Sequence, residues 1–259
     1  MKQQAGLKFA ASAGLLALGL SAGGSAHALP LTLPTSLMDA TSVMALSEEA
    51  YDGMSAVGIS MSSLGNAYQV AGITSSDGTV LPAFALPITE VSVNLGLFSG
   101  LTPTAGEAMG SALTVSRGSN SLVLANFQID YSSEQVLADV IVSGVTTTGM
   151  AIYSFDAVDD LAISLNGLTL NMHQQLANLM LTTAAQDTFA SALKLNKAVK
   201  GALSVLDFGT ITIDINGALR KPVSATAFTA AMVPEPGPAS MMGLGLLALM
   251  WVARRKLSN

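Results

Sequence analysis

The side chains that most often perform acid–base or metal chemistry are scarce in this sequence. It has no cysteine and only two histidines, His27 and His173. A zinc site or a Ser-His-Asp hydrolase needs a histidine together with other converging side chains. His27 lies in an N-terminal segment that we expect to be removed, which leaves His173 alone. We interpret His173 as a surface or helix-capping residue, and we predict no metal site and no cofactor.

Acidic side chains offer a second route to catalysis. The densest acidic group of the chain is Asp156, Asp159 and Asp160. Glycosidases use two carboxylates that can come from distant strands, so the sequence leaves a secreted polysaccharide hydrolase open. Such an enzyme usually also needs aromatic side chains to stack on sugar rings, and the only tryptophan, Trp251, lies in a C-terminal apolar run. We interpret the acidic group as the rim of a loop, and we predict no catalytic residue.

A short acidic motif near the C-terminus has some features of a cation site. Asp214-Ile215-Asn216-Gly217 resembles a fragment of a calcium loop. A complete loop continues with a third alternating ligand and a distal glutamate, and both are missing here. Asn-Gly between two apolar runs is instead a strong signal for a β-hairpin turn. We therefore predict a hairpin at Asn216-Gly217, with Ala218 to Ala230 as the returning strand.

The C-terminal part of the chain, Val233 to Asn259, consists of three segments of different character. Pro234-Glu235-Pro236 is stiff and extended, because each proline fixes its own φ and keeps the preceding residue out of the helical region. An uncharged apolar run follows from Ala239 to Ala253, and Arg254-Arg255-Lys256 forms a basic cluster behind it. A helix over the apolar run would be about 22 Å long. With snorkelling arginines and local thinning it could cross a bilayer core of about 30 Å, with the basic cluster in the cytoplasm.

These three segments together resemble the PEP-CTERM sorting signal of Gram-negative bacteria. The resemblance implies that an exosortase processes the chain near Pro234-Glu235-Pro236 and supplies the catalytic groups itself. It also implies an association with exopolysaccharide, in an envelope, biofilm or floc. The resemblance covers about a tenth of the chain, so it concerns the handling of the protein and says little about the body. The alternative is an ordinary C-terminal anchor in the inner membrane that is never processed.

The N-terminus has the organisation of a secretory signal peptide. Lys2 and Lys8 supply positive charge, Phe9 to Leu20 is apolar, and Ala26-His27-Ala28 is a small-x-small cleavage site. We predict that signal peptidase cleaves after Ala28, with Ala26 and Ala28 as the recognised small residues. The secretion machinery would then place a body running from Leu29 to Val233 on the outer side of the inner membrane.

The charge of this body limits its partners. The whole chain has a formal net charge of −6. Between Leu29 and Leu193 the only lysine or arginine is Arg117, against fourteen aspartates and glutamates. Such an acidic surface should not attract nucleic acid or other polyanions. Because an exported chain without cysteine cannot use disulfides, the body must be stabilised by its core.

The body divides by pattern into two parts. Residues 29–66 are predicted as an N-terminal leader that is partly helical, with a helix from Ser36 to Gly53 that begins at the capping-box-like Ser36-x-x-Asp39. Residues 67–230 are predicted as a β-rich domain, because apolar residues there recur with a period of two. The predicted strands are Tyr68–Thr74, Ile88–Phe98, Ser121–Tyr131, Gln135–Val142, Met150–Ala157, Leu161–Leu170 and Leu203–Ile215.

One segment of the β-rich part has a different pattern. Asn171 to Lys200 contains no proline or glycine, and its apolar residues fall roughly on one helical face. Its C-terminal end contains Lys194, Lys197 and Lys200, and cations there interact favourably with the helix dipole. We therefore predict a mainly antiparallel β fold, a sandwich or an open barrel, with one long helix near the C-terminal side.

These patterns favour an exported, non-enzymatic protein of the cell surface or extracellular matrix. Two other classes of function stay open at this stage. A hydrolase would require a cleft with two carboxylates about 5–9.5 Å apart. A ligand-binding β module would require a pocket lined by residues on the inner faces of the strands.

Overall fold

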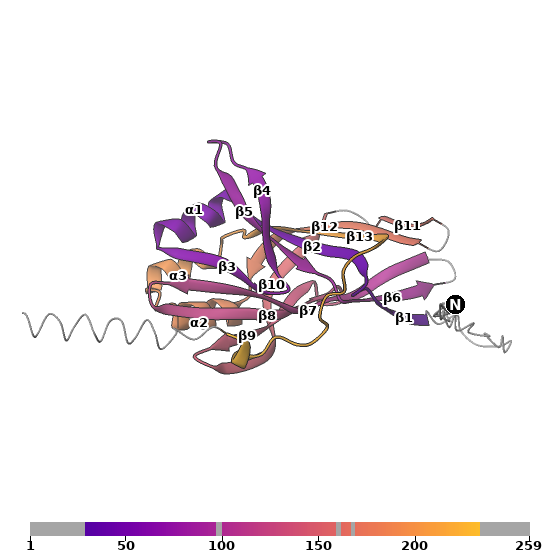
Figure 1. Ribbon diagram of the computed structural model, residues 1–259. Helices are drawn as coiled ribbons and strands as arrows, with labels where there is room; N and C mark the ends of the chain where they lie inside the picture. The colour runs from indigo at the N-terminus through magenta and orange to yellow at the C-terminus, as the bar shows by residue number, and fades with distance from the viewer. Residues whose placement is uncertain (1–28, 97–99, 159–161, 167–168, 234–259) are drawn as a thin grey trace, which may run out of the picture.

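A computed structural model describes residues 29–96, 100–158, 162–166 and 169–233 of the chain (Figure 1). These residues form one antiparallel sheet of thirteen strands with short helices at one end (Figure 1). The prediction of a mainly antiparallel β fold is therefore confirmed. The strands are β1 (Leu29–Pro34), β2 (Met38–Leu46), β3 (Ile59–Gly65), β4 (Tyr68–Thr74), β5 (Val80–Pro87), β6 (Glu90–Gly96), β7 (Gly100–Arg117), β8 (Asn120–Asp130), β9 (Gln135–Val142), β10 (Val145–Ala157), β11 (Ala162–Asn166), β12 (Thr169–Leu181) and β13 (Gly209–Leu219).

The sheet runs in the order β1-β6-β7-β8-β9-β10-β12-β13-β2-β5-β4. Two further strands lie off this path, since β3 pairs with the second half of β7 and β11 pairs with β12. The strands from β6 to β10 follow the chain order, as expected for successive hairpins. β13, near the C-terminal side, pairs with β2, near the N-terminal side. The predicted leader is therefore part of the same sheet as the remainder of the body.

The described α-helices lie together at one end of the sheet (Figure 1). They are α1 (Glu48–Ala56), α2 (Thr183–Ala192) and α3 (Lys197–Leu203). Each begins at a residue whose side-chain oxygen accepts a hydrogen bond from a backbone N–H of the first turn: Ser47, Thr182 and Asn196. Such N-caps stabilise a helix by about 1 kcal/mol each.

A single hydrophobic core connects most of these elements. Among its fully buried side chains are Phe84, Leu124, Tyr153 and Leu176 from four different strands, together with Ala50 of α1. Tyr153 packs on Phe208 with ring centroids 5.5 Å apart. The two parts that the sequence analysis divided at residue 66 thus share one core.

The predicted helix from Ser36 to Gly53 is wrong over most of its length. Ala40, Ser42, Met44 and Leu46 are buried in alternation, and this period of two makes β2 a strand. Only the end of the prediction is helical, because α1 begins at Glu48. Its N-cap is Ser47, whose Oγ accepts from the Ala50 N–H at 3.0 Å, rather than Ser36.

The predicted long helix from Asn171 to Lys200 is also wrong. Its first part is the strand β12, and two short helices, α2 and α3, replace the second part. The prediction failed because β12 has a bulge at Asn178, where φ is 54° and the pairing of β10 with β12 shifts register. The bulge places buried Leu176 and Leu179 three residues apart, a spacing that imitates the face of a helix.

The predicted hairpin at Asn216-Gly217 does not form. A type I′ turn needs positive φ at both central residues, and neither residue has it. The chain instead continues in β13 through a register shift between Asn216 and Leu219. Asn216 Nδ2 donates to Asp39 Oδ2 of β2 at 2.8 Å, so its side chain bonds to the neighbouring strand. The predicted returning strand, Ala218 to Ala230, is therefore replaced by irregular chain beyond Leu219.

None of the described helices has the length and hydropathy that crossing a membrane requires. The apolar run Ala239–Ala253 lies outside the described residues, and so does the predicted signal peptide.

Candidate functional site

The residues predicted to direct sorting flank the described body. Ala26 and Ala28, Pro234-Glu235-Pro236, and Arg254-Arg255-Lys256 all lie outside the described residues. The body itself shows where these segments attach. Leu29, the first residue after the predicted cleavage site, pairs with Leu95 in the first position of β1. At the other end, Val233 is the last described residue and directly precedes Pro234.

The chain between Pro222 and Val233, which we call the C-terminal strap, lies across the outer face of the sheet. It has no regular strand, and it ends in a short 3₁₀ turn at Ala230–Met232. Its start is fixed by Arg220, whose guanidinium donates to the carbonyl oxygens of Ala40 and Ile88. Partial burial lowers the pKa of Arg220, and the nearby Asp39 carboxylate opposes this shift.

Asn126 of β8 fixes the middle of the C-terminal strap. Its Oδ1 accepts from the Phe228 N–H at 2.7 Å and from the Gly110 N–H at 3.2 Å. Its Nδ2 donates to the Phe228 carbonyl at 2.9 Å and to Asp139 Oδ2 at 2.7 Å. The amide therefore uses two donor and two acceptor positions, in a side chain that is only 7% exposed.

Apolar contact adds to these hydrogen bonds. The Phe228 ring packs on a small cluster, separate from the main core, formed by the outer-face residues Ala112, Val123, Ala125 and Ile141. Asn66 also bonds the C-terminal strap to the sheet, because its Nδ2 donates to the Ser224 carbonyl of the strap at 2.7 Å and to the Met109 carbonyl of β7 at 2.9 Å. Val233 packs against the same cluster. The C-terminal strap is thus held to the sheet until one residue before Pro234.

His173 and Asp214 form an exposed pair on neighbouring strands. His173 Nδ1 lies 2.6 Å from Asp214 Oδ1, and both side chains are more than half exposed. They border a shallow hollow of about 450 Å³ whose other lining residues are Ala162, Asn171, Met172, Ile215 and Asn216. None of these is a nucleophile. His173 is a surface residue, as predicted, but it lies in β12 and caps no helix.

The acidic residues singled out in the sequence do not form a common site among the described residues. Asp156 accepts from Asn178 Nδ2 at 2.8 Å on the exposed surface, while Asp159 and Asp160 lie outside the described residues. No group of three or more metal-ligating side chains comes together in the part of the chain that the structure describes. The calcium-loop fragment is part of β13, where Asp214 and Asn216 contact neighbouring strands instead.

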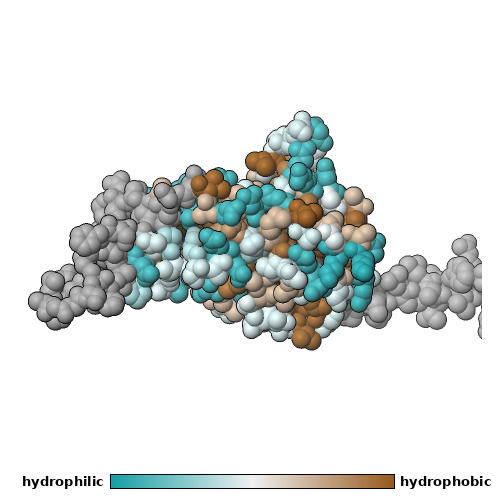
Figure 2. Space-filling model, turned by 180° about the vertical axis from the view of Figure 1, so that it is seen from behind, coloured by the Kyte–Doolittle hydropathy of each residue, from teal (hydrophilic) through white to brown (hydrophobic). Residues whose placement is uncertain are grey.

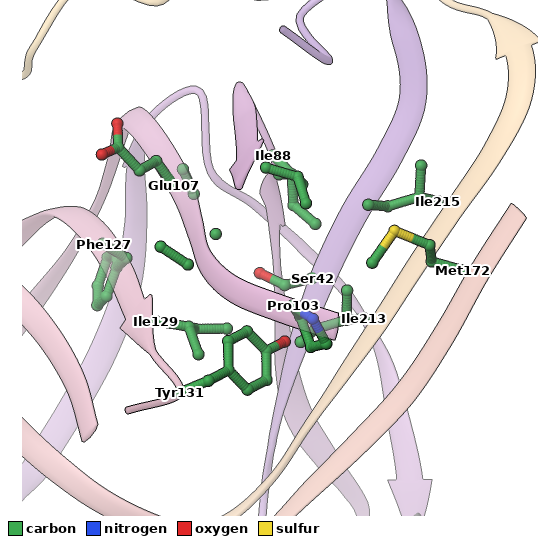
Figure 3. A pocket seen from close by; sticks show the side chains of 14 residues that line it. Ser42, Ile88, Pro103, Glu107, Phe127, Ile129, Tyr131, Met172, Ile213 and Ile215 are labelled. Atoms are coloured by element: carbon green, nitrogen blue, oxygen red, sulfur yellow. The ribbon is translucent and has the colours of Figure 1, made fainter. Parts of the chain in front are cut away.

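An internal cavity lies between the inner faces of the strands (Figure 3). Its lining is almost entirely apolar and includes Ile88, Phe127, Met172 and Ile213. Its volume is about 30 Å³, which accommodates about one water molecule. Ligand pockets for drug-sized molecules are about 300–1,000 Å³, so this cavity holds no such ligand in the present conformation.

Glu107 lines this cavity and has a second glutamate beside it on the neighbouring strand. Glu107 of β7 is directly opposite Glu90 of β6 in the strand register. Burial and, to a smaller extent, the Glu90 charge raise the pKa of Glu107. The Glu107 carboxylate points away from the other labelled side chains (Figure 3). Sequence reasoning missed this pair because Glu90 and Glu107 are seventeen positions apart and meet only through strand pairing.

The Glu90–Glu107 pair predicts a specific pH dependence of stability. Because the pKa of Glu107 is higher in the folded protein, folding favours the protonated acid, and this contribution is lost as pH rises through the folded-state pKa. Glu107→Gln should therefore stabilise the body at pH 7 by about 0.5 kcal/mol, and the gain should shrink toward pH 4. Urea unfolding at both pH values measures it, with Glu134→Gln in an exposed turn as control. A gain that stays constant with pH would contradict the prediction.

Comparisons with known proteins place this chain in no described family. No protein-family model matches it, and no curated protein matches it. Among solved structures, the C-terminal domain of HtaA from Corynebacterium glutamicum is similar at 13% sequence identity, over 70% of this chain and 98% of that chain, with a TM-score of 0.38. This likeness is too distant to bear on function.

Proposed function

We propose that this chain is an exported, non-enzymatic protein of the cell surface or extracellular matrix that is sorted through its C-terminal segment. The observation that carries the proposal is the order of Pro234-Glu235-Pro236, the apolar run Ala239–Ala253 and the basic cluster Arg254-Arg255-Lys256. An exosortase is the processing partner in this proposal, with the inner membrane as the site of the precursor. Exopolysaccharide is the proposed surrounding polymer, and nucleic acid is no partner.

The organisation of the body supports both processing steps. Removal of residues 1–28 would leave β1 complete, because its first residue is Leu29. Removal of the chain beyond the Pro-Glu-Pro motif would leave the C-terminal strap complete, because its last apolar contact is Val233. Neither cleavage would break a described strand pair.

The short stretch of chain after the C-terminal strap also limits the distance between the body and the membrane. Residues 234–238 separate Val233 from the apolar run. Five residues can span at most about 17 Å. In the anchored precursor, the outer face of β8 and β9 beside Val233 would therefore lie close to the bilayer, within reach of a membrane-embedded protease.

The test of this proposal is the C-terminal residue of the mature protein. Intact mass would be measured on the protein from cell-surface and inner-membrane fractions. We expect a surface form that begins at Leu29, ends near Glu235 and lacks Arg254-Arg255-Lys256. A mass that runs through to Asn259 in every fraction would overturn the sorting proposal and make Ala239–Ala253 a permanent anchor.

A further inference from the structure

The hairpin of β4 and β5 projects from the body beyond the rest of the sheet (Figure 1). A bulge in β4 between Ala71 and Thr74 bends it. Gly72 is required there, since a Cβ atom at this position would lie 2.0 Å from the Leu81 carbonyl oxygen. β4 is the last strand of the sheet and pairs only with β5 among the described residues, so its second edge is unpaired.

Unpaired strand edges invite pairing with another chain unless prolines, charges or a covering element block them. β1, at the opposite end of the sheet, is protected by Pro30 and Pro34. β4 has the sequence YQVAGIT, with no proline and no charged residue. Its bulge leaves Tyr68 to Ala71 in regular pairing with β5, and this stretch has no protective residue.

A groove of about 470 Å³ runs beside this edge. Its lining is mixed: Leu46, Met54 and Ile59 are apolar, Ser55 and Ser60 are polar, and Gln69, Val70 and Ala71 of β4 form one side. The groove therefore offers room for another strand next to β4, with both apolar and polar groups to contact its side chains.

Large apolar side chains are exposed on the same hairpin. Tyr68, Ile73 and Val80 are 50%, 61% and 59% exposed. Seen from behind, the projection carries hydrophobic as well as hydrophilic residues (Figure 2). Exposed apolar groups next to an unpaired edge are typical of an association surface.

The distribution of charge permits a second copy of the chain as the partner. From Met54 to Thr89 the only charged side chain is Asp77, although the whole chain has a net charge of −6. Copies of an acidic chain repel each other unless they meet at a neutral surface. The strands β4 and β5 contain no charged residue and supply such a surface, while Asp77 and Glu48, which accepts from Ser76 Oγ, lie at the turn of the hairpin.

We propose that two copies of this chain associate through β4, edge to edge and antiparallel around a two-fold axis. Each β4 lies in the groove of the other copy, and the two sheets become continuous. Tyr68, Ile73 and Val80 of each copy are covered in the pair. This proposal deepens the proposed surface or matrix function, because it names a second copy of the chain as a partner.

A lysine on the exposed edge tests the association. The full chain would be purified in mild detergent, and its oligomeric state measured by analytical ultracentrifugation across a concentration series. Ile73→Lys should weaken the dimer by roughly tenfold or more in Kd, because it buries an unpaired charge at the interface. Val145→Lys is the control, since Val145 is 70% exposed in β10, outside the β4–β5 hairpin, and pairs with Val142 of β9. A monomer at all concentrations, or a dimer equally strong in both variants, would overturn the proposal.

Cysteine crosslinking supplies a second test that is independent of C-terminal processing. The chain has no cysteine, so single cysteines can be placed in turn at Tyr68, Gln69, Val70 and Ala71. Because a two-fold axis brings a residue near it close to its own copy, one or two of these variants should form disulfide dimers in cells treated with a mild oxidant. Thr148→Cys on exposed β10 should stay monomeric. Equal crosslinking at Thr148, or none along β4, would contradict the pairing whether or not the tail is cleaved.

Discussion

Replacing Pro234 and Pro236 with alanine is expected to block C-terminal maturation while leaving the body folded. The two prolines keep Glu235 extended, and a protease needs its substrate in one defined conformation at the catalytic groups. Misplacement of a substrate by about 1 Å can cost roughly 100-fold in rate. We expect a similar loss in the rate of processing, and the uncleaved precursor should accumulate in the inner membrane. Intact mass of the membrane fraction and a pulse-chase of the precursor would measure both effects.

The controls for this experiment separate the motif from general stiffness of the segment. Pro238→Ala removes a proline from the same segment but leaves Pro234-Glu235-Pro236 intact, so it should mature at nearly the normal rate. The body should unfold at the same temperature in all variants, since the last described contact is made by Val233. If the double alanine variant matures normally, the Pro-Glu-Pro motif has no role in sorting. If Pro238→Ala is blocked equally, stiffness rather than the motif is required.

Two strands have the predicted bounds: β4, Tyr68–Thr74, and β9, Gln135–Val142. In β9 the local pattern is sufficient, because burial alternates along most of the strand as its side chains point to the two faces of the sheet. β4 was found despite its bulge, since its bounds are set by the turn residues around it. The turn at Ser132, Ser133 and Glu134 lies between the predicted strands Ser121–Tyr131 and Gln135–Val142.

Bulges account for the largest failure of the sequence analysis. One extra residue in a strand shifts every later side chain to the opposite face. In β12 this shift at Asn178 turns a period of two into an apparent helical face. Nothing local marks the residue, because asparagine is also common in turns and helix caps.

The candidate site depends on contacts that no local pattern contains. Asn126 and Phe228 are 102 positions apart, and Glu90 meets Glu107 only through the register of β6 and β7. The segments proposed to direct export and sorting are, in contrast, contiguous motifs, and they lie outside the described residues. Contacts between residues far apart in the sequence, such as those of Asn126 and Glu107, follow from the strand order and register, which the local patterns do not contain.

Asn126 should be among the most sensitive positions of the body. In Asn126→Gly the backbone can keep its φ of 53°, but the N–H and C=O of Phe228 and the N–H of Gly110 lose their side-chain partner. Unpaired buried polar groups cost about 1–3 kcal/mol, so we expect a loss of about 3 kcal/mol. For a body of this size, that corresponds to a fall of about 8 °C in Tm. Asn126→Ala should be worse, because a Cβ atom at positive φ adds backbone strain.

Asn178 provides the matched control for this prediction. It too is an asparagine at positive φ in a bulge, with φ of 54°, but it is exposed and makes one side-chain hydrogen bond, to Asp156. Asn178→Gly should therefore change stability by less than about 0.5 kcal/mol. Hydrogen exchange would show the location of the loss: the amides of residues 224–233 should exchange faster in Asn126→Gly and stay protected in Asn178→Gly. Unchanged protection in Asn126→Gly would mean that Phe228 and its apolar contacts hold the C-terminal strap without the asparagine. The fixed position of Val233 would then depend on packing alone.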